Sequence, residues 1–137
     1  MSGFFQPEVL DAARVAVADG FRLENPPFYG ILKRVGYSSL LDLSQIAAIT
    51  YHNIIVSHEP ITDAVLFHEL VHVEQYRQLG VAKFSELYVR GFLLGGGYDG
   101  IPLEIIAYKL GFRFESAPGR QFSVADNVAR WIREERF

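Results

Sequence analysis

Two histidines one helical turn apart, with a glutamate beside the first, constrain this chain more than any other feature. They occur in the stretch His68-Glu69-Leu70-Val71-His72. Residues four apart on an α-helix return to the same face, so both imidazoles can reach one metal ion. Zinc hydrolases use this HExxH arrangement, in which the histidines bind the metal and the glutamate accepts a proton from the activated water. The stretch therefore predicts a metal-binding helix.

The surrounding residues favour one uninterrupted helix over residues 62–79. This segment contains neither Gly nor Pro, Thr62 and Asp63 suit its start, and Gly80 stands where helices commonly end. Multiplying the His and Glu frequencies gives on the order of one chance occurrence of the pattern per hundred such chains. The alternative interpretation is a pair of histidines on an ordinary buried helix, with Glu69 exposed to solvent.

Length and charge exclude several classes of protein. A chain of 137 residues, half of them hydrophobic, predicts a single globular domain over residues 1–137. A net charge of -3 without a basic cluster argues against a nucleic-acid partner, because phosphate binding needs concentrated Lys and Arg. There are no cysteines, so any zinc must be held by nitrogen and oxygen ligands.

The N-terminal segment carries no secretory signal. Its first twenty residues include Glu8, Asp11 and Asp19 and lack a basic region followed by an apolar block. No apolar run approaches the ~20 residues needed to cross a bilayer. These features predict a cytoplasmic protein with no membrane partner, while export by a dedicated system and the oligomeric state stay open.

The expected fold class is α+β, mostly helical, with a short hairpin ahead of the metal helix. The expected hairpin spans residues 46–57, with its turn at Tyr51-His52-Asn53. It could simply cover the core, or its exposed strand could align an extended peptide by adding it as a further strand. The expected helices, written by residue numbers, are 7–20, 62–79, 81–94, 102–114 and 123–133, with a loop at 24–30 and an ambiguous segment at 31–43.

A catalytic zinc site usually has three protein ligands and an open position for water, so a third ligand is required. His52 falls at the expected hairpin tip and His58 just before the metal helix. A metzincin would have its third histidine six residues after His72, and Gln78 occupies that place. The metzincin pattern is therefore excluded.

Glu104 is the better candidate for the third ligand. On the helix over residues 102–114 it falls beside the apolar stripe, on one face with Tyr108 and Gly111. The stripe itself comprises Leu103, Ile106, Ala107 and Leu110. The alternative for Glu104 is a first-turn carboxylate that merely complements the helix dipole.

The run His68-Glu69-Leu70-Val71-His72-Val73-Glu74-Gln75-Tyr76, followed by Pro102-Leu103-Glu104-Ile105-Ile106-Ala107-Tyr108, resembles the small bacterial gluzincins, also called minigluzincins. The resemblance covers roughly residues 46–116, while residues 1–45 match nothing and have no assigned role. It implies a zincin-like core and a zinc metallopeptidase in which Glu104 completes the ligand set of His68 and His72.

This interpretation assigns a role to each candidate. Zn²⁺ is held by His68, His72 and Glu104, Glu69 acts as general base, and the substrate is a peptide or protein. Tyr108 is the chosen oxyanion donor and Tyr98 the other candidate. Glu74 and Gln75 could orient a ligand imidazole or form a solvated face, and they are left out of the site. The alternatives are a catalytically silent zinc-binding domain of a secretion or toxin assembly, and a zymogen-like latent state.

Overall fold

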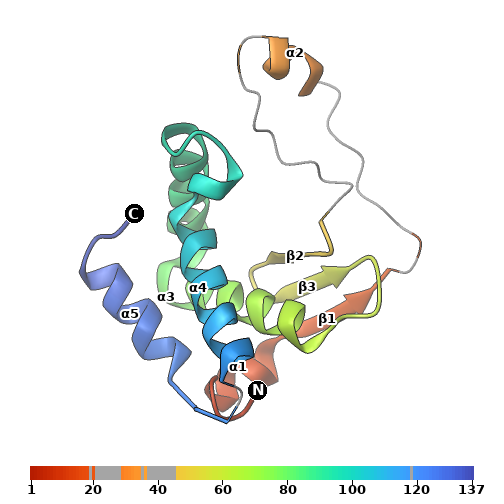
Figure 1. The fold of residues 1–137 in the computed structure, drawn as a ribbon, viewed down its shortest axis with the longest axis vertical. Coiled ribbons are helices and arrows are strands. Elements are labelled where there is room, and N and C mark those ends of the chain that lie inside the picture. The colour runs from red at the N-terminus through yellow and green to blue at the C-terminus, as the bar shows by residue number, and fades with distance from the viewer. Residues whose placement is uncertain (19, 21–28, 35, 37–45, 118) are drawn as a thin grey trace.

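The computed structural model describes residues 1–18, 20, 29–34, 36, 46–117 and 119–137. It has an α+β fold that is mostly helical, with a small mixed sheet of three strands. The pair α3 and α4 lies between this sheet on one side and α5 on the other (Figure 1). The elements are α1 (Pro7–Ala12), β1 (Arg14–Val17), α2 (Tyr29–Arg34), β2 (Ala48–Tyr51), β3 (Ile54–Ser57), α3 (Asp63–Leu94), the 3₁₀ turn η2 (Tyr98–Gly100), α4 (Pro102–Ser116) and α5 (Val124–Arg133).

The predicted hairpin is confirmed. Strand β2 pairs antiparallel with β3, and Tyr51 lies opposite Ile54 across a two-residue turn in which His52 has a positive φ of 58°. Strand β1 pairs parallel with the other side of β3, so β3 is central and β2 forms an edge of the sheet. Alternation along β3 buries Ile55 against the helices, as expected for a sheet with one covered face.

The predicted first helix is wrong beyond Ala12. Instead of continuing to residue 20, the chain leaves α1 and forms β1, which pairs from Arg14 opposite Ile54 to Val17 opposite Ser57. Pairing with a distant strand overrides the weak local helix preference of these residues. The predicted loop at 24–30 is also wrong at its end, because α2 begins at Tyr29, while residues 24–28 lie outside the described chain.

Helix α3 begins at the predicted place. The Thr62 hydroxyl caps it by accepting a hydrogen bond from the Val65 backbone N–H. Gly80 was predicted to end this helix, but it only interrupts it, with φ 72° and ψ 161°, and helical geometry resumes directly. The predicted helices over 62–79 and 81–94 are therefore consecutive segments of α3, joined at a conformation that favours glycine.

Close contact between α3 and α4 fixes where Glu104 lies. A Cβ on Gly91 would stand 2.6 Å from Pro102 Cδ, so only glycine lets the first turn of α4 approach this closely. From that start, Leu103, Ala107 and Leu110 are buried as the apolar stripe predicted. Glu104 consequently faces α3, close to its two histidines.

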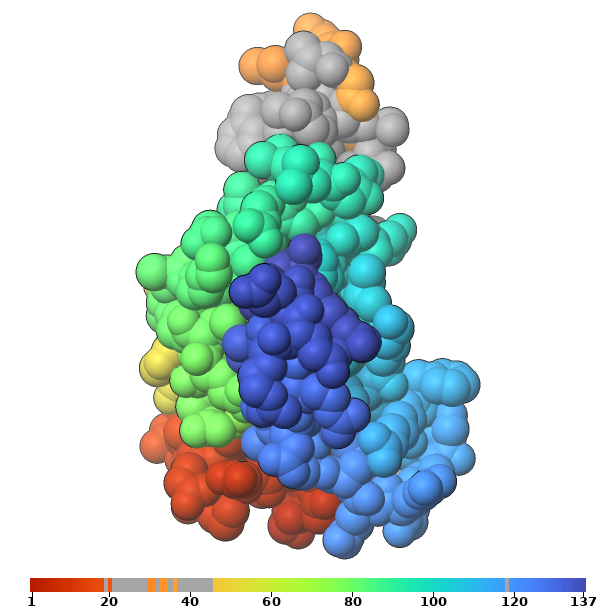
Figure 2. Space-filling model, turned by 90° about the vertical axis from the view of Figure 1, so that its left-hand side faces the viewer, coloured from red at the N-terminus to blue at the C-terminus, as the bar shows by residue number. Residues whose placement is uncertain are grey.

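Two apolar clusters form the core, one at each end of α3. The first includes Phe67, which stacks on Phe114 at 4.4 Å between ring centroids. The second includes Phe84, which stacks on Tyr76 at 3.6 Å and lies in the same cluster as Trp131 of α5. Helix α5, dark blue in Figure 2, lies across α3 and α4. Across the described residues, no helix combines the length and apolar character that a bilayer crossing requires.

Candidate metal centre

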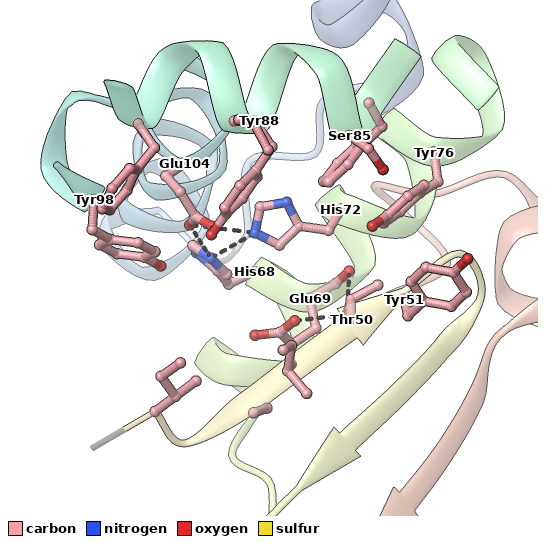
Figure 3. A pocket seen from close by; sticks show the side chains of 16 residues that line it. Thr50, Tyr51, His68, Glu69, His72, Tyr76, Ser85, Tyr88, Tyr98 and Glu104 are labelled. Atoms are coloured by element: carbon pink, nitrogen blue, oxygen red, sulfur yellow. Dashed lines mark hydrogen bonds and ion pairs between the residues drawn. The ribbon is translucent and has the colours of Figure 1, made fainter. Parts of the chain in front are cut away.

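The structure brings the three predicted metal ligands together in one triangle. His68 Nε2 and His72 Nε2 lie 3.0 Å apart. Glu104 Oε2 lies 3.2 Å from His68 Nε2 and 3.4 Å from His72 Nε2 (Figure 3). Within the described part of the chain, these are the residues grouped closely enough to hold a metal through three side chains. Two come from consecutive turns of α3 and the third from the first turn of α4.

This triangle has a size and a donor set that could hold a metal ion. Bonds of roughly 2.0–2.1 Å in tetrahedral geometry place ligand atoms about 3.3–3.4 Å from one another, close to the three edges of the triangle. Two imidazole nitrogens at 3.0 Å beside a carboxylate oxygen need a proton or a cation between them, since their lone pairs otherwise repel. All three side chains are at most 14% exposed. Each of the three residues offers one ligand atom, so together they could hold one metal ion.

A buried amide orients the second imidazole. Gln75 Nε2 donates to the Leu103 carbonyl at 3.0 Å, which leaves Gln75 Oε1 to accept from His72 Nδ1 at 2.8 Å. His72 therefore carries a proton on Nδ1, and its Nε2 is the ring nitrogen that faces the triangle. Such support of a ligand histidine is a common feature of metal sites. Gln75 thus belongs to the site, although the sequence interpretation left it out.

Electrostatics in the triangle favour an ionised carboxylate. Burial alone would raise the pKa of Glu104, but hydrogen bonds from His68 and His72 outweigh it and hold that pKa well below its usual range. Burial would likewise lower the pKa of His72, but the hydrogen bond with Glu104 and the negative charges of Glu104 and Glu69 together outweigh it, so the pKa of His72 is raised. A buried anion that attracts positive charge is ready to receive a metal.

The predicted general base lies beside the ligands and is held by the sheet. Glu69 is 5% exposed, and its Oε2 accepts a hydrogen bond of 2.6 Å from the Thr50 hydroxyl on β2 (Figure 3). Thr50 points to the buried face of the sheet because the strand alternates between faces. The edge strand thereby fixes the carboxylate that the motif assigns to proton transfer.

Three tyrosines surround the ligands in different ways. Tyr108 is 56% exposed, and its ring packs against His68 at 4.5 Å between centroids. A hydrogen bond from Tyr98 helps to lower the pKa of Glu104, and the Tyr98 hydroxyl lies 3.5 Å from that of Tyr108. Tyr88, which sequence reasoning did not single out, donates to Glu104 Oε1 at 2.9 Å.

The other candidates point elsewhere. His52 lies in the hairpin turn and bonds its neighbour Asn53, and neither His52 nor His58 joins the triangle. Gln78, in the metzincin position, bonds Glu74 and the Ala125 carbonyl of α5. Glu74 is buried in that structural network rather than in the metal site.

Two cavities meet at His68 and Glu69. The first, of about 410 Å³, runs between β2 and the later turns of α3, where Phe84 and Phe92 contribute to its wall. The second, of about 700 Å³, runs along α4 past Tyr108 to Glu115. The predicted base and the three candidate ligands therefore line an open cleft rather than a sealed interior.

Thr50, Gln75 and Tyr88 are the residues that sequence reasoning missed. Gln75 had a usable signal, since it lies one turn after His72 and an imidazole ligand usually needs a partner. Thr50 and Tyr88 had none, because their bonds to Glu69 and Glu104 depend on how the sheet and the later turns of α3 fold back.

Comparison with known proteins adds no relative to this description. No family model, no curated protein and no solved structure matches the chain significantly. The geometry of the candidate metal centre is therefore the basis for its proposed function.

Proposed function

We propose that this chain is a zinc-dependent metallopeptidase with a zincin-like core of the gluzincin type. One observation carries the proposal: a triangle of two imidazoles and one carboxylate lies in an open cleft beside a second, non-ligand carboxylate. A structural zinc site has four protein ligands and no need for a base, whereas a hydrolytic site has three and needs one. The metal triangle and Glu69 together match the hydrolytic pattern.

His68, His72 and Glu104 would hold the ion. The chemistry that a bound Zn²⁺ would supply is acidification of a water molecule and polarisation of the scissile carbonyl. Glu69 takes the proton from the attacking water and delivers it to the leaving amine, as general base and then general acid. The hydrogen bond from Thr50 keeps the Glu69 carboxylate turned toward the cleft during this exchange.

A donor is also needed for the charge that develops on the carbonyl oxygen. Tyr108 is the candidate, because its ring lies on His68, more than half of the side chain is exposed, and its hydroxyl is not committed to a ligand. Tyr98 is less suitable, since it helps to hold the pKa of Glu104 low.

An extended peptide is the substrate that the cleft best accommodates. Strand β2 is an edge of the sheet that the described residues form, and Ala48 of this strand lines both cavities. A peptide added beside β2 would satisfy that edge by backbone hydrogen bonds and carry one of its peptide bonds past Glu69.

Glu69→Gln is the direct test of the chemistry. The variant should keep about one zinc per chain by metal analysis, while hydrolysis of a broad peptide library falls by about 10²–10⁴-fold. Glu86→Gln, on an exposed turn of the same helix, is the matched control and should retain wild-type turnover. If the wild type and Glu69→Gln bind zinc alike and neither cleaves any peptide, the chain is a zinc-binding domain without hydrolytic activity.

Glu104→Ala tests the ligand set separately. Removing a ligand should weaken zinc binding by more than the ~10–100-fold that follows loss of an outer partner. Competition with a coloured chelator measures the affinity. An affinity equal to that of the wild type would remove Glu104 from the site.

A further inference from the structure

The two oxygens of the Glu104 carboxylate face different partners. Oε2 is turned toward the imidazoles, 3.2 Å from His68 Nε2 and 3.4 Å from His72 Nε2. Oε1 instead accepts the hydrogen bond of 2.9 Å from the Tyr88 hydroxyl. One oxygen thus belongs to the metal triangle and the other to a phenol on the far segment of α3 (Figure 3).

Tyr88 is fixed in this position by its surroundings. Its ring stacks on Phe84 at 5.8 Å between centroids with an interplanar angle of 19°. Its hydroxyl is the donor of the hydrogen bond with Glu104, because the oxygen of an ionised carboxylate can only accept. A carboxylate oxygen that accepts a well-placed, partly buried hydrogen bond loses that bond if it turns to the metal.

We propose that Tyr88 is a positioning residue that restricts Glu104 to a single metal-binding oxygen. The proposal rests on the zinc site proposed above. A carboxylate can bind zinc through one oxygen or through both, and the second mode would use the position that water and substrate need. By holding Oε1, Tyr88 keeps that position open. Its role is exerted through Glu104 rather than on the substrate.

Cobalt substitution gives a readout that does not depend on activity. Co²⁺ in place of zinc absorbs visible light strongly in a four-coordinate site and more weakly when the coordination number rises. Tyr88→Phe should therefore lower the intensity of this band, because the released Oε1 joins the metal. Tyr76→Phe is the matched control, because the Tyr76 ring also stacks on Phe84 and its hydroxyl makes no hydrogen bond within the described residues.

A double-mutant cycle separates positioning from a merely structural role. Tyr88→Phe should lower zinc affinity by about tenfold in the wild-type background, as is typical when a residue that supports a metal ligand is removed. In the Glu104→Ala background the same substitution should have no further effect, because the group it positions is gone. A purely structural contribution would instead lower the thermal stability of the metal-free protein equally in both backgrounds.

The outcomes are decisive. An unchanged cobalt spectrum in Tyr88→Phe, or the same loss of zinc affinity with and without Glu104, overturns the assignment. A spectrum altered by Tyr98→Phe but not by Tyr88→Phe also overturns it, since the positioning phenol would then be Tyr98. If the wild type binds zinc but cleaves nothing, the peptidase proposal fails while these metal readouts still judge Tyr88.

Discussion

The two segments of α3, before and after Gly80, meet very different demands. Residues 69–76 in the first segment are all buried, because the sheet, α4 and α5 surround this part of the helix. In the second segment, residues 81–94, only Phe84 and Leu87 are buried. The first segment packs against neighbouring elements on every side. The second packs through one face, and other residues of the same segment line the cleft.

The difference extends to polar groups. In the first segment, buried Glu69, His72 and Gln75 each have a partner, as buried polar groups require. The second segment contributes one polar contact to the site, the hydrogen bond from Tyr88 to Glu104. One helix thus combines a tightly packed part, which carries the candidate ligands His68 and His72, with a cleft wall that depends on few contacts.

The largest difference in stability is expected between two Leu→Ala substitutions, one at Leu70 in the first segment and one at Leu94 in the second. Leu70→Ala should reduce the free energy of unfolding by about 2–5 kcal/mol, because Leu70 is 3% exposed in a packed core. Chemical denaturation of the metal-free protein measures this change. A loss below about 1 kcal/mol would show that the first segment is less constrained than its burial implies.

Gln75→Leu tests whether the polar network of the first segment serves the metal. It removes the acceptor for His72 Nδ1 while preserving the bulk of the side chain, so zinc affinity should fall by about 10–100-fold. Chelator competition gives the affinity, and circular dichroism checks the fold. Wild-type affinity in a folded variant would mean that His72 needs no such partner.

Gly80→Ala examines the junction between the segments. The φ of 72° with ψ of 161° is strained for any residue with a side chain, so the free energy of unfolding should fall by about 1–3 kcal/mol. Apart from its chain neighbours and the backbone of its own helix, no described atom stands within 4 Å of the added methyl group, which makes the backbone conformation the source of the loss. Equal stability in thermal melts would show that the two segments can rearrange at this point.

Leu94→Ala should have the smallest effect. Leu94 is 82% exposed near the end of the second segment, so stability should change by no more than about 0.5 kcal/mol. Chemical denaturation of Leu94→Ala and Leu70→Ala under the same conditions compares the two segments directly. A loss as large as that of Leu70→Ala would mean that the second segment packs against something in solution.

The elements that could be predicted from sequence are those with strong local signals. The hairpin, the start of α3 at Thr62 and the helix after Pro102 follow from turn, cap and periodicity patterns. Strand β1 could not be predicted, since it exists only through its pairing with β3, about forty residues along the chain. The continuation of α3 past Gly80 likewise depends on packing rather than on local preference.

The residues of the site also divide into those with a local sequence signal and those that depend on distant contacts. His68, Glu69 and His72 are recognisable because helix geometry alone brings residues four apart together. Glu104 was a sound expectation from its place beside an apolar stripe, and the contact at Gly91 is what brings it to the histidines. Thr50 and Tyr88 form hydrogen bonds with Glu69 and Glu104 on other elements or distant turns, so no spacing in the sequence predicts them.

The triangle spans two helices whose contributing residues, His68 and Glu104, are 36 positions apart in the chain. An ion bound there would act as a cross-link that the unfolded chain cannot form. Zinc at a hundred times its dissociation constant would add about 2.7 kcal/mol to the free energy of unfolding. The supply of one trace element would then set how long this domain survives unfolding and proteolysis, quite apart from any reaction it catalyses.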